Sequence, residues 1–276
     1  MQLPGPGVFG PPRDRDAALA VLHRAVELGV DHIDTAQFYG PDVANELIHE
    51  ALHPYPDNLA LVSKVGGRRD DNGGWLPAHE PDELRRGIED NLRTLGVDQL
   101  AAVNLRVMDT DAPDPNRPGT LRREEFDNQL TAMIKARDEG LIAGIGLSNI
   151  TLEHLRFALQ RTEIVTVQNA FNLVDRSSQP LLEETAERGI AFVPFFPLGS
   201  GFAADNPVLG NPVVQRTAEQ LGRTPAQIAL AWTLTVAPNV LLIPGTSSVR
   251  HLEENMAVAD LELDGDTRRE LDAVAE

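Results

Sequence analysis

The stretch Asp31-His-Ile-Asp-Thr-Ala-Gln-Phe-Tyr-Gly40 predicts a short strand that runs into a loop carrying Tyr39. Asp34 lies at the end of this strand. The next predicted strand along the chain ends on Lys64. An acid, a phenol and an amine can therefore meet where these two strands end.

Such a group of side chains has a recognisable chemistry. A tyrosine is normally a poor acid near neutral pH. A nearby ammonium favours the phenolate and lowers the pKa of a phenol, and a carboxylate can hold that ammonium charged and in place. Asp34, Tyr39 and Lys64 would together form a tuned general acid–base. On spacing alone, the commoner explanation is a surface tyrosine, a structural aspartate and an unrelated lysine, because most ion pairs are structural.

Predicted strands and helices alternate along the whole chain, and the strand segments are short and continuously apolar, as in Val240-Leu-Leu-Ile243. Strands of this kind are buried on both faces, which is typical of a parallel sheet. The strands are expected at residues 32–35, 59–64, 101–105, 142–147, 164–168, 190–195 and 240–243. The expected fold class is an α/β, (β/α)8 TIM barrel. Its first strand is expected to be short or missing, since an eighth strand would lie at or before residues 1–3.

The spacing of apolar residues and the capping signals predict the helices that alternate with these strands. They are expected at residues 14–28, 43–51, 81–95, 121–139, 151–160, 178–188 and 213–221, then after Thr224-Pro225, and last at 251–258. Residues 66–80 and 109–120 are expected to be loops. Because no linker or repeat divides the chain, one domain over residues 1–276 is expected.

Composition narrows the class of protein. The chain has no cysteine, which excludes disulfides, thiolate metal sites and a cysteine nucleophile. The histidines are scattered without metal-ligand spacing, so no metal is expected. A formal net charge of −18 argues against binding to nucleic acid or to an anionic membrane. With no signal peptide or apolar run of membrane length in sight, we expect a cytoplasmic protein, as a monomer or weak homo-oligomer.

The pattern Gly29-Val-Asp-His-Ile-Asp-Thr-Ala-x-x-Tyr39-Gly resembles the aldo-keto reductase signature, with Lys64 where that family has its lysine. Further matches follow in the family's order at residues 140–149, 168–169, 197–201, 243–248 and 254–255. The resemblance implies an enzyme that reduces an aldehyde or ketone with a nicotinamide cofactor, usually NADPH. Asp34, Tyr39 and Lys64 would then be catalytic, with Tyr39 as the general acid.

The resemblance also implies a set of cofactor-binding residues. Ser148, Asn149 and Gln168 would hold the nicotinamide, and Phe195 stands where the family often has a tyrosine stacked on that ring. The remaining predicted contacts are Pro197, Leu198, Gly199, Ser200, Gly201, Ile243, Gly245, Thr246, Ser247, Arg250, His251, Glu254 and Asn255.

Two features bear on the choice of cofactor. The segment before residue 249 precedes a helix, whose N-terminus favours anions, and Arg250 and His251 add positive potential for a 2′-phosphate. Many family members instead have a lysine at the Gly245 position and an arginine at the His251 position. NADPH (NADP+) is expected, with NADH less favoured.

One departure from the family pattern concerns the substrate. The fourth family strand usually ends on a histidine, but this chain reads Val103-Asn-Leu-Arg106, so we expect Arg106 to act on the carbonyl. Phe9, Phe38, Trp75 and Asn104 are the predicted substrate contacts. These features are similar to a bacterial branch that includes pyridoxal reductases, so pyridoxal is the favoured small-molecule carbonyl substrate.

Two other classes of function stay open at this stage. One is a cofactor-binding regulator with little turnover, like the channel β-subunits that resemble this family. The other is a lyase that forms a Schiff base through Lys64, although this class leaves Tyr39 and the Ser148–Asn149 pair without a role.

Overall fold

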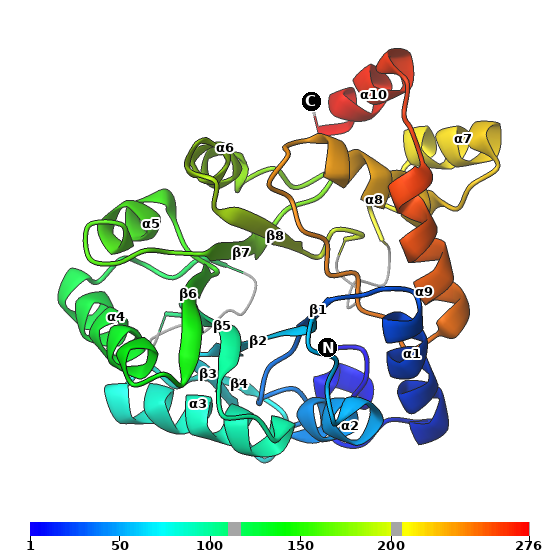
Figure 1. Ribbon diagram of the computed structural model, residues 1–276. Coiled ribbons are helices and arrows are strands. Elements are labelled where there is room, and N and C mark those ends of the chain that lie inside the picture. The colour runs from blue at the N-terminus through cyan, green and yellow to red at the C-terminus, as the bar shows by residue number, and fades with distance from the viewer. Residues whose placement is uncertain (110–116, 200–205, 276) are drawn as a thin grey trace. The chain divides into compact units, whose positions relative to one another are not determined.

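The computed structural model (Figure 1) describes residues 1–109, 117–199 and 206–275. The chain divides into two compact units. The first unit comprises Met1–Gln168 and Gly245–Val249, and the second comprises Asn169–Pro244 and Arg250–Glu276. The expectation of a single domain stays a prediction.

The first unit alternates strands and helices as the sequence predicts. Its elements are η1 (Pro6–Val8), α1 (Arg15–Glu27), β1 (His32–Asp34), α2 (Val43–Leu52), β2 (Ala60–Val65), β3 (Gly67–Arg69), β4 (Trp75–Pro77), α3 (Pro81–Leu95), β5 (Leu100–Arg106), α4 (Arg123–Asp138), β6 (Ile142–Ser148), α5 (Leu152–Ala158) and the start of β7 (Thr166–Ala170). The strands pair in parallel in the order β1-β2-β5-β6-β7.

Register decides which side chains share the inner face of this sheet. Lys64 pairs with Asn104, Asn104 with Gly146, and Gly146 with Thr166, so these four residues form one layer across β2, β5, β6 and β7. Arg106, Ser148 and Gln168 form the next layer toward the strand ends. The residues between the layers point outward, toward the helices that flank the strands in Figure 1.

Gly146 is required by the contact that crosses it. Thr166 Oγ1 donates to Asn104 Oδ1 over 2.9 Å, directly above the glycine. A Cβ atom at position 146 would lie 2.1 Å from Asn104 Oδ1. The missing side chain therefore allows β5 to bond to β7 across β6.

Helix α3 shows how local sequence places the outer layer. Glu80 and Glu83 form a capping box at its start, with Pro81 in the first turn, and Gly96 ends it in the left-handed conformation. Leu84, Ile88 and Leu95 are buried on one face of this helix. The predicted bounds of this helix, residues 81–95, are confirmed.

The second unit contains the end of β7, α6 (Gln179–Arg188), β8 (Ala191–Phe195), α7 (Pro212–Leu221), α8 (Pro225–Thr235), nearly all of α9 (Val249–Met256), η2 (Ala257–Asp260), α10 (Gly265–Asp272) and η3 (Ala273–Ala275). Just beyond β7, the Phe171 N–H donates to the Phe195 carbonyl of β8. Phe171 stacks on Trp232 of α8 with ring centroids 5.9 Å apart and meets Phe192 edge to face. These buried rings form the centre of this unit.

Three sequence predictions about elements are wrong. Residues 66–80 are not a simple loop, because β3 and β4 pair there as an antiparallel hairpin. Residues 240–243 are not a full strand and make a single parallel bridge, from Val240 to Phe192. The helix near residue 251 is not the last one, since α10 follows it. In the first two cases, hydrogen bonding between backbone segments decides whether a strand forms. The spacing of apolar residues does not predict that bonding.

Before α1, the described residues form only the η1 turn and one end of an isolated bridge, from Phe9 to Gly40. Within the part of the chain that the structure describes, no helix is long and apolar enough to cross a membrane. The same residues contain no group of three or more histidines and carboxylates arranged to hold a metal ion.

Candidate active site

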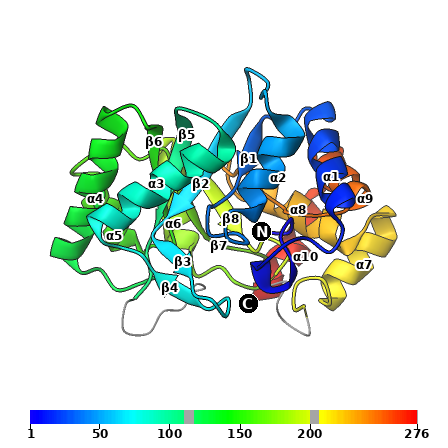
Figure 2. The same ribbon diagram turned by 90° about the horizontal axis from the view of Figure 1, so that it is seen from below.

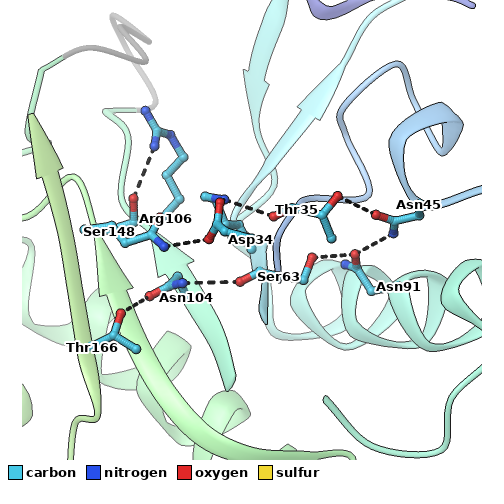
Figure 3. Close-up of polar contacts among 11 residues, drawn as sticks. Asp34, Thr35, Asn45, Ser63, Asn91, Asn104, Arg106, Ser148 and Thr166 are labelled. Atoms are coloured by element: carbon cyan, nitrogen blue, oxygen red, sulfur yellow. Dashed lines mark hydrogen bonds and ion pairs between the residues drawn. The ribbon is translucent and has the colours of Figure 1, made fainter. Parts of the chain in front are cut away.

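The Asp34 carboxylate, at the end of β1, accepts hydrogen bonds from two other strands of the first unit. Lys64 Nζ on β2 donates to Asp34 Oδ1, and the Gln168 amide on β7 donates to Asp34 Oδ2 over 2.6 Å. Lys64 Nζ also donates to the Thr35 carbonyl over 2.9 Å. Figure 3 shows Asp34 among the polar contacts of this site. The carboxylate thus links β1 to both β2 and β7.

Lys64 is buried, with 3% of its surface exposed. Burial by itself lowers the pKa of this lysine, but the Asp34 carboxylate and the Tyr39 phenol oppose that effect, and the net pKa of Lys64 is raised. The lysine is therefore an ammonium in the neutral pH range. Because its charge is held by Asp34 and the Thr35 carbonyl, the amine is poorly suited to attack a carbonyl as a Schiff-base lysine would.

Tyr39 lies next to this ammonium. The Nζ atom of Lys64 is 5.1 Å from the centroid of the Tyr39 ring, and Tyr39 is almost fully buried. The structure therefore brings Asp34, Tyr39 and Lys64 together, as the first quoted stretch predicts. A phenol beside a fixed cation and away from bulk water can exchange a proton with a ligand oxygen.

Arg106 ends β5 and lies in the layer above Lys64. Its Nη1 donates to Ser148 Oγ over 3.2 Å (Figure 3). The Gln168 side chain belongs to the same layer, and its Oε1 is buried without a hydrogen-bond partner among the described residues. A buried acceptor of this kind is costly unless a ligand donor or a water reaches it.

Asn149 and Asn104 are engaged within the protein. Asn149 has a left-handed backbone with φ 59°, and its amide donates to the carbonyls of Val107 and Arg117. Asn104 is fully buried between the Ser63 carbonyl and the Thr166 hydroxyl. The predicted roles of Asn149 in cofactor binding and of Asn104 in substrate binding stay predictions, and the geometry of Asn104 favours a packing role.

A buried polar network outside the inner layers was missed from sequence. Thr35 follows Asp34 and donates to Asn45 of α2, while Ser63 precedes Lys64 and donates to Asn91 of α3. Asn45 Nδ2 then donates to Asn91 Oδ1 over 2.9 Å, which closes the network (Figure 3). Strand alternation could have signalled it, because the neighbours of inward residues must face the helices.

The predicted aromatic residues form a row that leads away from Tyr39. Phe38 meets Tyr39 edge to face with ring centroids 5.3 Å apart, and Trp75 of β4 meets Phe38 in the same way at 5.6 Å. Phe9 lies near the same hairpin through Arg69. The structure thus groups all three predicted aromatic substrate contacts on one side of Tyr39.

The predicted cofactor residues of the second unit form their own local arrangement. The Phe195 ring meets Phe196 edge to face at 5.3 Å, and Phe196 has a left-handed backbone with φ 56°. The turn that follows contains Pro197, Leu198 and Gly199, and Asn206 donates to the Leu198 carbonyl over 2.8 Å. Ser200 and Gly201 lie outside the described residues.

The segment before α9 is partly exposed and is held by local side-chain contacts. Ile243 is partly buried, Gly245 and Ser247 are exposed, and Thr246 Oγ1 accepts from the Ser248 N–H over 3.0 Å. Within α9, Arg250 pairs with Glu254 and contacts His251, and the Asn255 amide donates to the Pro244 carbonyl. The roles of these residues in cofactor binding stay predictions.

A parallel α/β sheet whose strand ends carry a buried lysine, an aspartate and a tyrosine defines a candidate enzyme of the barrel class. The sequence model that describes the aldo/keto reductase family matches residues 4–276 of this chain. The chain therefore belongs to the aldo/keto reductase family, and the predicted (β/α)8 fold class is confirmed.

Individual relatives agree with this assignment. Pyridoxine 4-dehydrogenase of Escherichia coli strain K12 is 48% identical over 275 residues, which cover 100% of this chain and 92% of that protein. An uncharacterized oxidoreductase of Schizosaccharomyces pombe is 38% identical, covering 99% and 83%. The crystal structure of a Klebsiella pneumoniae aldo/keto reductase in complex with NADP and acetate matches with a TM-score of 0.80 at 26% identity, covering 100% and 90%.

The buried network predicts a specific sensitivity at Asn91. Asn91→Leu keeps the branched shape and the number of heavy atoms of the side chain but leaves the Asn45 amide and the Ser63 hydroxyl without this partner. We expect the free energy of unfolding to fall by about 2–4 kcal/mol, from the cost of unsatisfied buried groups. Urea denaturation followed by circular dichroism measures it. Asn128→Leu, at an exposed position of α4, is the matched control and should stay within about 0.5 kcal/mol; equal losses would contradict the assignment.

Proposed function

We propose that this protein reduces an aldehyde or ketone to the alcohol with NADPH as the hydride donor. The observation that carries the proposal is the buried Lys64 ammonium, held by Asp34 beside the ring of Tyr39. Membership of the aldo/keto reductase family supports it, as does a Klebsiella pneumoniae relative solved in complex with NADPH. The protein is thus an oxidoreductase of the NAD(P)H-dependent aldo-keto reductase class.

Each candidate catalytic residue has a separate task. When bound, the cofactor would supply the hydride that the carbonyl carbon accepts. Tyr39 donates a proton to the carbonyl oxygen as the negative charge develops there. Lys64 supplies positive charge next to that phenol, and Asp34 keeps the lysine charged and fixed. Arg106 places a permanent cation at the same strand ends, where it can stabilise an alkoxide.

The residues present fit a nicotinamide nucleotide. Gln168 Oε1 is buried without a hydrogen-bond partner in the described part of the chain, so it can accept from a carboxamide N–H, in a layer that also contains Ser148. Phe195 offers an aromatic face for stacking, although it lacks the tyrosine hydroxyl common in the family. The N-terminus of α9, with Arg250 and His251, suits a 2′-phosphate in an otherwise acidic protein. We therefore propose NADPH in preference to NADH.

Pyridoxal is the substrate we favour. The Escherichia coli relative at 48% identity is a pyridoxine 4-dehydrogenase, and oxidation of pyridoxine at that position is the reverse of pyridoxal reduction. Phe38 and Trp75 give an aromatic wall beside Tyr39. Arg106 can pair with the phenolate that pyridoxal carries next to its aldehyde.

We further propose that the protein acts in the cytoplasm as one domain over residues 1–276, as a monomer or weak homo-oligomer. The net charge of −18 supports a small-molecule substrate over nucleic acid or an anionic membrane surface.

Tyr39→Phe tests the proton donor directly, because it removes the hydroxyl and little volume. We expect kcat for pyridoxal reduction to fall by about 10²–10⁴-fold, the usual contribution of general acid catalysis. Oxidation of NADPH, followed by absorbance, measures turnover. Fluorescence titration with NADPH and with NADH provides the control, since cofactor affinity should stay nearly unchanged. Turnover by the variant close to that of the wild type would contradict the proposed mechanism.

Arg106→Met tests whether this arginine reads the charge of the substrate. The specificity constant for pyridoxal should exceed that for a neutral aromatic aldehyde of similar size in the wild type. The variant should narrow this gap by about 1.5–3 kcal/mol, the range for a hydrogen bond to a charged group. Steady-state kinetics with both aldehydes measure the difference. An equal loss for the two substrates would show that Arg106 does not recognise the phenolate.

A further inference from the structure

Arg69, the last residue of β3, fastens the β3–β4 hairpin to the N-terminal turn of the first unit. Its guanidinium donates to the Val8 carbonyl over 3.0 Å and to the Gly7 carbonyl over 2.9 Å, and its Nε donates to the Gly73 carbonyl over 3.1 Å. Figure 2 shows this hairpin beside the dark blue N-terminal turn. An arginine fixed by three backbone carbonyls has lost most of its side-chain freedom.

The same guanidinium lies between two aromatic rings. Its central carbon is 4.2 Å from the centroid of the Trp75 ring and 5.5 Å from that of Phe9. Arg69 and Trp75 are direct partners in the register of the hairpin, which places their side chains on one face. A cation over an indole attracts its ring electrostatically, and more strongly when it is partly desolvated. The Trp75 ring therefore packs against a guanidinium that is itself held by backbone carbonyls.

Ring contacts connect Trp75 to Tyr39 through Phe38. Trp75 meets Phe38 at an interplanar angle of 78°, and Phe38 meets Tyr39 at 89°. Phe38 is almost fully buried and closely packed, so a shift of Trp75 would also displace Phe38. Released from Arg69, the indole would have other rotamers open to it on the partly exposed side of the hairpin.

We propose that Arg69 is a positioning residue that sets substrate specificity by holding Trp75 rigid against Phe38, in the row of aromatic rings that begins at Tyr39. The inference rests on the proposed function, in which a carbonyl substrate binds next to Tyr39. A preordered flat wall favours planar aromatic carbonyl compounds, because the entropy of ordering the indole is lost during folding and not during binding. A small aliphatic aldehyde gains little from such a wall.

Arg69→Met is the principal test, with Arg68→Met as the matched control. Arg68 is the preceding residue of β3, is exposed, and loses the same charge in the control. For Arg69→Met we expect KM for pyridoxal to rise about three- to tenfold, the effect of one newly mobile interface side chain. The kcat for pyridoxal, and both kcat and KM for butanal, should stay within about twofold of the wild-type values. Arg69→Lys keeps the cation but not the fork of donors and should give an intermediate KM.

Trp75 fluorescence provides a readout that does not need turnover. Emission of Trp75, obtained by subtracting the spectrum of Trp75→Phe, should become more accessible to acrylamide in Arg69→Met and not in Arg68→Met. Pyridoxal binding followed by quenching of the same emission should weaken by the same factor as KM rises. A folded Arg69→Met protein with the specificity and accessibility of Arg68→Met would overturn the proposal.

Failure of the proposed function gives a different pattern. Wild-type protein that turns over neither aldehyde with NADPH would contradict the proposed reaction. The role of Arg69 is then decided by pyridoxal binding alone: weaker binding in Arg69→Met than in Arg68→Met supports it, and equal binding contradicts it.

Discussion

The buried ion pair between Lys64 and Asp34 is the interaction on which the rest of the site depends. An ammonium with 3% exposure is costly unless a carboxylate and further acceptors surround it, and here Asp34 and the Thr35 carbonyl meet that need. The Gln168 amide on β7 donates to the second oxygen of the Asp34 carboxylate. The pair is thus both a constraint on the fold and the source of the positive charge next to Tyr39.

The parallel register of the strands determines which side chains join this ion pair in the site. Inner layers repeat every second residue, so the side chains next to Asp34 and Lys64 must face outward, where Thr35 and Ser63 join the Asn45–Asn91 network. Gly146 has the complementary role on the inner face, since its missing side chain lets Asn104 reach Thr166. The positions of the strands that carry the reacting groups are therefore fixed from both faces.

Features that depend on neighbouring residues could be predicted from sequence, and features that depend on distant partners could not. Strand ends at Asp34 and Lys64 follow from apolar segments, and α3 follows from its cap and stripe. By contrast, the bond from Gln168 to Asp34 joins residues 134 positions apart, and the β3–β4 hairpin lies in a polar segment without strand-like alternation. The Val240 segment looks like a strand by composition, but makes only one bridge. Pairing of this kind is decided by tertiary geometry.

Lys64→Met gives the most direct test of the account, because it removes the ammonium and keeps an apolar chain of similar length. NADPH affinity from fluorescence titration and pyridoxal turnover from NADPH absorbance should be measured on the same folded preparation. The account predicts cofactor binding within a few-fold of the wild type and a loss of kcat of at least about 10²-fold. Turnover within threefold of the wild type, with binding intact, would contradict the central role of the Asp34–Lys64 pair.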